Sequence, residues 1–208
     1  MIAFDIFDES DSLAEKLQKV IIDLPLLDDS SRIKTSDIAC SLSLEHWHSA
    51  RFLLRANLLP SALVVHRAQF EAVTRSIWLT YAASNEQISK LTAKLSLESE
   101  QTAKNMPQIA QMMQALGKSG PQQAYDALIR FKDNSWKALN SYAHAGLHPI
   151  KRHHEGYPLG LLHDVLRNTN GLAVMSYMQA VVLSGQQPLQ RTILDIAVKH
   201  SECMPPTI

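Results

Sequence analysis

The chain has 208 residues, which is long enough for one domain with a substantial core and short for two. Its 20 lysines and arginines equal its 20 aspartates and glutamates. This balance excludes a global field that would attract nucleic acid or an anionic membrane, so any such binding needs a local patch. The two cysteines, Cys40 and Cys203, are too few and too far apart in sequence to indicate a disulfide framework, and we expect both to be reduced.

The N-terminal segment Met1–Glu9 carries acids where a signal peptide would carry bases. No apolar run reaches the roughly 18 to 20 residues that a membrane span requires. We therefore expect a soluble, cytoplasmic protein that does not contact a membrane.

Apolar residues recur at three- and four-residue spacing in almost every long segment, and glycine is scarce at 7 residues. This pattern predicts an all-α protein. In chain order, the predicted helices are Ser10–Leu24, Ser36 or Asp37 to Leu58, Pro60–Ala83, Asn85 to just before Pro107, Pro107–Leu116 with Gly117 as its end, Pro121–His144, Pro158–Gly185 and Leu189–His200. Gly146 is placed to cap the helix that ends at His144, and a loop is expected over Pro149–Tyr157. Residues 1–208 are expected to form one antiparallel helical bundle with additional short helices and a tail that frays from about Met204.

The predicted helix Pro60–Ala83 is apolar on nearly every side, which places it at the centre of the bundle. Its charges Arg67, Glu71 and Arg75 are each one helical turn apart, so Glu71 can reach both arginines. The favoured interpretation is a structural arginine–glutamate–arginine ladder in a helix–helix seam. The alternative leaves one guanidinium free to bind phosphate or carboxylate. We expect His66 to be a hydrogen-bonded core histidine.

The predicted helix that ends at His144 carries a polar stripe, which includes Lys137, Asn140 and His144. Basic residues follow at once: His148, Lys151, Arg152, His153 and His154. A solvated face explains such a stripe, and the helix dipole favours cations at this end. The alternative is a site in which these groups bind an anion and transfer a proton. No complete ligand set surrounds the histidines, so we predict neither a metal nor a cofactor.

His163 and Arg167 share a stripe near the start of the helix that follows Pro158. If this helix packs antiparallel to its predecessor, both side chains can approach Lys137 and His144 and add to an anion site. They can equally be polar side chains that rim one end of the bundle.

A combination of segments spans most of the chain: Gln69–Leu79 (QFEAVTRSIWL), Trp136–Pro149 (WKALNSYAHAGLHP), Gly156–Pro158 and Val165–Asn170. It resembles an uncharacterised family of small bacterial helical proteins known only as a domain of unknown function, and this resemblance implies no activity. More distantly, the helical layout and the helix ending in His144 are similar to the HEPN superfamily. That superfamily includes metal-independent ribonucleases of toxin–antitoxin and abortive-infection systems, whose active pair is an arginine followed a few residues later by a histidine. The window ahead of His144 holds Lys137 and Asn140 but no arginine.

Two functional hypotheses follow. In the first, a HEPN-like bacterial protein binds or cleaves RNA in a defence or toxin–antitoxin context, with His144 as general acid/base, Asn140 orienting it and Lys137 on the phosphate. Further anion-binding residues would be Arg152, His148, His163 and Arg167. In the second, the protein is a non-enzymatic interaction or scaffold module for a second copy or a cognate partner protein. We expect a homodimer, because the apolar excess of the long helices leaves a self-complementary face.

Overall fold

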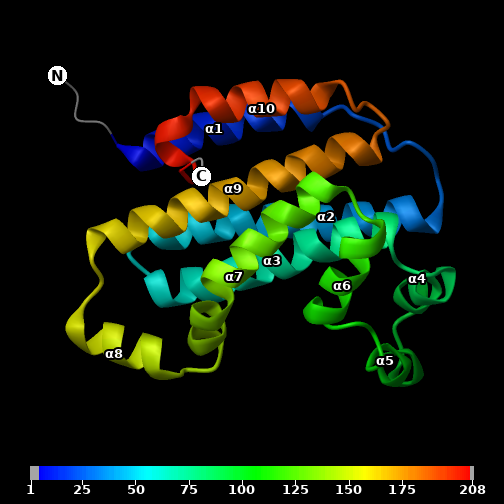
Figure 1. The fold of residues 1–208 in the computed structure, drawn as a ribbon, viewed down its shortest axis with the longest axis horizontal. Helices are drawn as coiled ribbons and strands as arrows, with labels where there is room; N and C mark the ends of the chain where they lie inside the picture. The colour runs from blue at the N-terminus through cyan, green and yellow to red at the C-terminus, as the bar shows by residue number, and fades with distance from the viewer. Residues whose placement is uncertain (1–4, 207–208) are drawn as a thin grey trace.

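Residues 5–206, which the computed structural model describes, fold into ten α-helices and one short 3-10 helix, with no strand in this part of the chain (Figure 1). The helices are α1 (Ile6–Ile21), α2 (Ser31–Arg55), α3 (Leu59–Tyr81), α4 (Asn85–Thr92), α5 (Leu97–Ala103), α6 (Ile109–Ser119), α7 (Gln122–Ala143), α8 (Leu147–Glu155), α9 (Leu159–Leu183), α10 (Leu189–Lys199) and the 3-10 helix η1 (Ser201–Cys203). The prediction of an all-α fold is confirmed.

Two helices begin earlier than the apolar pattern predicts. α1 starts after Asp5, whose carboxylate accepts a hydrogen bond from a backbone N–H at 2.8 Å, and not at Ser10. α2 starts after Ser30, whose hydroxyl accepts a backbone N–H at 3.3 Å, and not at Ser36 or Asp37. These side chains satisfy N–H groups that have no partner inside the helix, so the local cap sets the boundary.

The single polar helix predicted to begin at Asn85 is two helices, α4 and α5. A second cap produces the break, because the Ser96 hydroxyl accepts a hydrogen bond from Ser99 N at 3.1 Å and starts α5.

α6 also differs from its prediction. It continues through Gly117, which was expected to end it, as far as Ser119.

The segment Pro149–Tyr157, predicted as a loop, is mostly helical and forms α8. Pro149 is the third residue of this helix, where a backbone N–H has no partner within the helix and its absence costs nothing. The turn that precedes α8 differs as well. Ala145 takes the left-handed conformation with a φ of 48°, whereas Gly146, the predicted cap, has a φ of −77°.

α3 lies at the centre of the bundle, as its apolar sequence predicts (Figure 1). It packs against α2, α6, α7 and α9. Leu63, Phe70 and Ile77 on one side of α3 are buried, and Tyr81 at the end of the helix is 36% exposed. His66 is buried beside Gln69, with its Nδ1 3.1 Å from Gln69 Oε1, and burial lowers the pKa of His66 to about 4. It is therefore neutral at pH 7, as expected of a core histidine.

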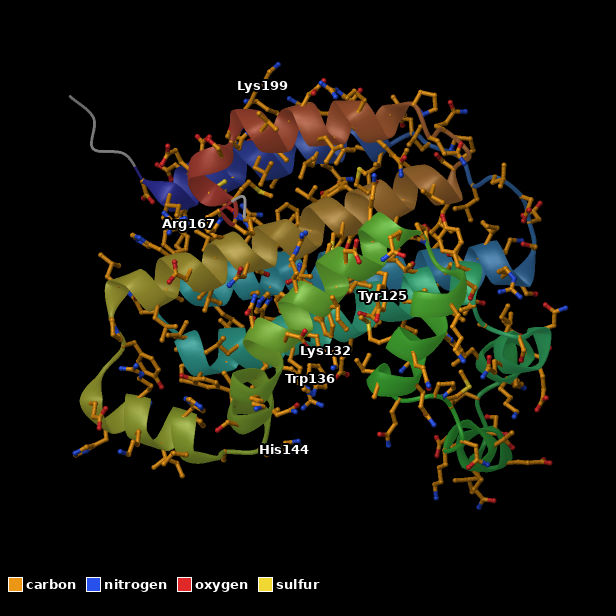
Figure 2. All side chains as sticks on the ribbon, in the orientation of Figure 1. Tyr125, Lys132, Trp136, His144, Arg167 and Lys199 are labelled. Atoms are coloured by element: carbon orange, nitrogen blue, oxygen red, sulfur yellow. The ribbon has the colours of Figure 1, made fainter. Side chains whose placement is uncertain are left out.

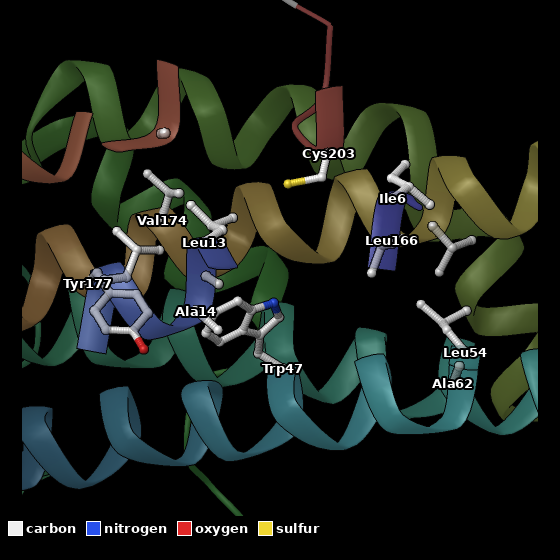
Figure 3. Packing of buried hydrophobic residues seen from close by; sticks show 14 of the residues in the cluster. Ile6, Leu13, Ala14, Trp47, Leu54, Ala62, Leu166, Val174, Tyr177 and Cys203 are labelled. Carbon is white, nitrogen blue, oxygen red and sulfur yellow. The ribbon is translucent and has the colours of Figure 1, made fainter. Parts of the chain in front are cut away.

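α1 and α10 form an outer layer, since they pack on each other and on α9 (Figure 1). Figure 3 shows the core beneath this layer, where Leu13 of α1, Trp47 of α2 and Tyr177 of α9 gather in one buried cluster. The Trp47 and Tyr177 rings meet edge to face, with centroids 5.8 Å apart. Aromatic rings in this arrangement add to the stabilisation that burial provides.

Asn170 on α9 joins four elements through one fully buried carboxamide. Its Oδ1 accepts hydrogen bonds from Ser10 Oγ of α1 at 3.0 Å and from Trp47 Nε1 of α2 at 2.9 Å. Its Nδ2 donates to the backbone oxygen of Cys203 in η1 at 2.8 Å. No water reaches these groups once they are buried, so each depends on the amide for its partner.

Replacing Asn170 with alanine should lower the free energy of unfolding by about 3 kcal/mol or more, because several buried polar groups lose their partner at once. Asn168→Ala is a matched control on the same helix. Its side chain is only half-buried and bonds to none of the described residues, so it should cost under about 0.5 kcal/mol. Urea denaturation measures both, and equal midpoints would show that the amide does not hold the bundle together.

Candidate functional site

The residues predicted as a catalytic group lie toward the C-terminal end of α7, beside the turn into α8; Figure 2 labels His144 there. Lys137 and His144 are exposed and Asn140 is half-buried. Helical spacing places the three on neighbouring positions of one face. Within residues 5–206, no side chain forms a hydrogen bond or ion pair with any of the three. They are open to a ligand, but nothing in the fold orients His144.

Ser141 fixes the turn between α7 and α8. Its hydroxyl accepts a hydrogen bond from His148 N at 3.1 Å, and its backbone oxygen accepts one from Gly146 N at 2.7 Å. A Cβ added to Gly146 would lie 2.7 Å from the Ser141 hydroxyl oxygen. Glycine is therefore required by the close approach of Ser141 and not by a left-handed φ.

α8 is a polar helix with no buried residue. Its basic side chains are His148, Lys151, Arg152, His153 and His154. Glu155 is its only acid. Neither Lys151 nor Arg152 pairs with a carboxylate among the described residues. The α7–α8 corner, which we define as Lys137 to Tyr157, therefore presents cations that are free to bind an anion.

Two tyrosine rings lie among the basic groups of the α7–α8 corner. The Tyr142 and His148 rings stack with centroids 6.4 Å apart, and the Tyr157 and His153 rings meet edge to face at 6.5 Å. Burial raises the pKa of Tyr142, the Tyr157 hydroxyl raises it further, and Arg152 opposes both. The Tyr157 hydroxyl is shielded from solvent and has no hydrogen-bond partner in the described chain. Tyr142 is buried and Tyr157 is half-buried, so the rings exposed beside the cations of this surface are those of His148 and His153.

Arg167 does not join this group. Its Nε donates to the backbone oxygen of Glu202 at 3.1 Å, and one terminal nitrogen lies 3.3 Å from Asp164 Oδ1. Figure 2 shows Arg167 on α9 well apart from His144. His163, one turn earlier on α9, is half-buried. The predicted approach of Arg167 to His144 therefore does not occur, because the Arg167 guanidinium binds the η1 turn instead.

Glu71 pairs with one of the two arginines that its spacing allows. Arg67 Nε lies 2.9 Å from Glu71 Oε1, and the two side chains are 24% and 35% exposed. The N–H is not aligned with the carboxylate for a hydrogen bond, so we treat the contact as an ion pair. The Arg67 guanidinium also lies over the Trp136 ring, 5.1 Å from its centroid. Burial lowers the pKa of Arg75 while Glu71 raises it, but no ion pair forms between them.

Sequence reasoning missed a second charged cluster, in which Arg51 of α2 meets α1. Arg51 Nε donates to Ser10 Oγ at 2.9 Å, its guanidinium contacts Asp11, and it lies over the Trp47 ring at 4.8 Å. Asp11 also binds Arg55 at 2.7 Å. Burial is the main reason that the pKa of Arg51 is lowered. The partners are 40 residues apart in sequence, and no periodic pattern could have joined them.

A surface pocket of about 290 Å³ opens beside this cluster, with His48 and Phe52 in its lining. Burial lowers the pKa of His48, and the Arg51 charge lowers it further, so His48 is neutral at pH 7. Asp11 forms ion pairs with both Arg51 and Arg55. The cluster therefore clamps α1 to α2 and leaves little free charge for a ligand.

Residues 5–206 contain no group of three or more histidine, cysteine, aspartate or glutamate side chains that could hold a metal ion. In the same stretch, no helix is both long and apolar enough to cross a membrane.

The chain belongs to a family of unknown function, DUF6988, whose model matches residues 40–206. The match includes α7, α8 and every residue of the predicted site. No curated protein and no solved structure matches the chain. The resemblance to a domain of unknown function is thus confirmed, and no link to the HEPN superfamily is shown.

Glu71→Ala should lower the free energy of unfolding by under about 1 kcal/mol, because the Arg67–Glu71 pair is partly solvated and the Arg67 guanidinium keeps its contact with Trp136. Thermal melts measure the change. Glu86→Ala, which removes the exposed pair with Lys90, is the matched control. A loss of about 3 kcal/mol or more for Glu71→Ala alone would mean that water does not reach the Arg67–Glu71 pair.

Proposed function

We propose that the protein binds RNA at the α7–α8 corner. The observation that carries this proposal is the unpaired basic face of α8, where Lys151 and Arg152 have no carboxylate partner in the described chain. Arginine and lysine side chains in such a setting are suited to phosphate oxygens. A local patch of this kind gives binding although the net charge of the whole protein is zero.

The exposed histidine rings in the α7–α8 corner favour RNA over a simple anion. His148 and His153 lie beside the cations, and each of these rings packs on a tyrosine, Tyr142 or Tyr157. Unpaired bases stack on aromatic side chains while phosphates bind nearby cations, which is how many proteins hold single-stranded RNA. A free phosphate has no aromatic ring that could stack on these side chains.

His144 is the group that we propose for RNA cleavage. It is exposed at the end of α7, one turn after Asn140 and two turns after Lys137. A histidine at this place can move a proton during breakage of a phosphodiester bond, and Lys137 can stabilise charge on the phosphate. Because His144 is exposed and no neighbouring group orients it, we propose RNA binding as the main activity. RNA cleavage depends on that binding.

Binding of a single-stranded RNA pool should weaken about tenfold between roughly 50 and 200 mM salt, as expected for two or three phosphate contacts. Arg152→Glu should weaken it further and make the salt dependence shallower. Lys19→Glu, an exposed charge reversal on α1, is the matched control and should leave binding unchanged. Fluorescence anisotropy with labelled RNA measures all three, and equal affinities for the two variants would contradict the proposal.

His144→Ala should abolish any RNA cleavage and leave RNA binding nearly intact, since a general acid/base acts mainly in the transition state. Cleavage is followed on gels with a chelator present. Cutting by the variant at the wild-type rate would remove His144 from the reaction, and a wild-type protein that binds RNA without cutting it would restrict the function to binding.

A second candidate function is a homodimeric interaction module, and a separate observation favours it. Three large apolar side chains on and beside α8 are exposed: Leu147 by 66%, Ile150 by 64% and Leu159 by 66%. Large apolar side chains exposed to this degree are typical of a contact surface for another chain, and a second copy is the simplest partner.

Light scattering tests this second candidate and should give twice the 23.2 kDa mass of the chain at micromolar concentration. Ile150→Asn should then yield a monomer. Ile38→Asn removes an equally exposed isoleucine from α2 and should leave the dimer unchanged. A monomeric wild-type protein, or a dimer insensitive to Ile150→Asn, would exclude this surface as the interface.

A further inference from the structure

A larger pocket lies between α3, α7, α9 and α10, near the N-terminal end of α7. Its volume is about 450 Å³, within the range of small-molecule sites. Its apolar lining includes Ile77 of α3, Ala127 of α7, Met175 and Met178 of α9, and Leu194 of α10. Four helices from three separate parts of the sequence thus line one open pocket.

No residue that lines this pocket carries a charge. A charged ligand would lose hydration there without gaining a counterion, so the pocket discriminates against ions. The two methionines, Met175 and Met178, are flexible and polarisable, and thioether sulfur makes favourable contacts with aromatic rings. The lining therefore suits an uncharged, mainly apolar molecule, and its thioethers favour an aromatic one.

Gln179 supplies one oriented polar group in the pocket. The side chain is 4% exposed, and its Nε2 donates to Thr80 Oγ1 at 2.7 Å. The single Thr80 hydroxyl hydrogen is already donated to Ser76 O at 3.0 Å, so Thr80 can only accept from Gln179. This fixes the amide orientation. The Gln179 Oε1 receives no hydrogen bond from the described residues and is left as an acceptor in the pocket lining.

Further polar groups in the lining are Gln123, Gln187, Gln190 and Tyr81, the last at the C-terminal end of α3. Burial raises the pKa of Tyr81, so its hydroxyl remains protonated at neutral pH and adds no charge to the pocket.

We propose that this pocket binds an uncharged aromatic small molecule that donates one hydrogen bond to Gln179 Oε1. The site is separate from the α7–α8 corner, and the proposal is independent of RNA binding.

N-phenyl-naphthylamine is a suitable probe, because it is neutral and aromatic, has one N–H donor and fluoresces strongly in apolar surroundings. Titration of the full chain should show saturable binding of one molecule per chain. Anilinonaphthalene sulfonate has the same ring system with an added negative charge, and it should bind at least about tenfold more weakly.

Two variants locate the probe. Ala127→Phe fills the pocket and should weaken binding by about tenfold or more, whereas Ala110→Phe places the same ring on the exposed face of α6 and should have no effect. Gln179→Leu removes the acceptor and should weaken binding by between about two- and tenfold. Circular dichroism confirms that each variant is folded.

The proposal is overturned if the wild-type protein binds no probe, if the sulfonate binds equally well, or if Ala127→Phe and Ala110→Phe behave alike. It is also overturned if Ala127→Phe converts a dimer into a monomer in light scattering, because a second copy would then cover the pocket.

Discussion

The buried carboxamide of Asn170 is the constraint on which the packing of the bundle depends. Trp47 Nε1 can only donate and the Cys203 backbone oxygen can only accept, so a single orientation of the amide satisfies both. The hydrogen-bond network continues from Ser10 to Arg51, and so reaches the surface at the Arg51 cluster between α1 and α2. Apolar contacts alone tolerate small shifts between helices, whereas a buried polar group without its partner costs free energy at once. The amide therefore selects one register for α1, α2, α9 and η1.

Much of this fold can be predicted from the period of the apolar residues. That period locates the long helices α3, α7 and α9 and places α3 at the centre, because a helix that is apolar on most sides must be covered on most sides. Boundaries are less predictable, since they depend on single side chains. Ser30 starts α2 earlier than expected by capping it, and Pro149 enters α8 because the first turn tolerates proline.

The candidate site could be predicted where its members are close in sequence. Lys137, Asn140 and His144 share one face of α7, and α8 follows directly, so helical spacing suffices to bring these groups together. Contacts between distant segments could not be predicted in this way. Arg167 is taken up by Glu202, 35 residues later, and Gln179 meets Thr80 across 99 residues. Only the packed structure reveals which side chains are already partnered and which remain free for a ligand.

The α7–α8 corner is distinguished from the other charged surfaces by the availability of its cations. In the Arg51 cluster, Asp8 and Asp11 balance the charges of Arg51 and Arg55, whereas Lys151 and Arg152 of α8 have no carboxylate partner in the described chain and lie beside exposed histidine rings. Ultraviolet cross-linking to single-stranded RNA, with the modified peptides identified by mass spectrometry, tests this distinction most directly. We predict cross-links within residues 137–157, on the exposed histidine rings. Cross-links concentrated around Arg51, or none at concentrations that saturate a known RNA-binding control protein, would contradict it.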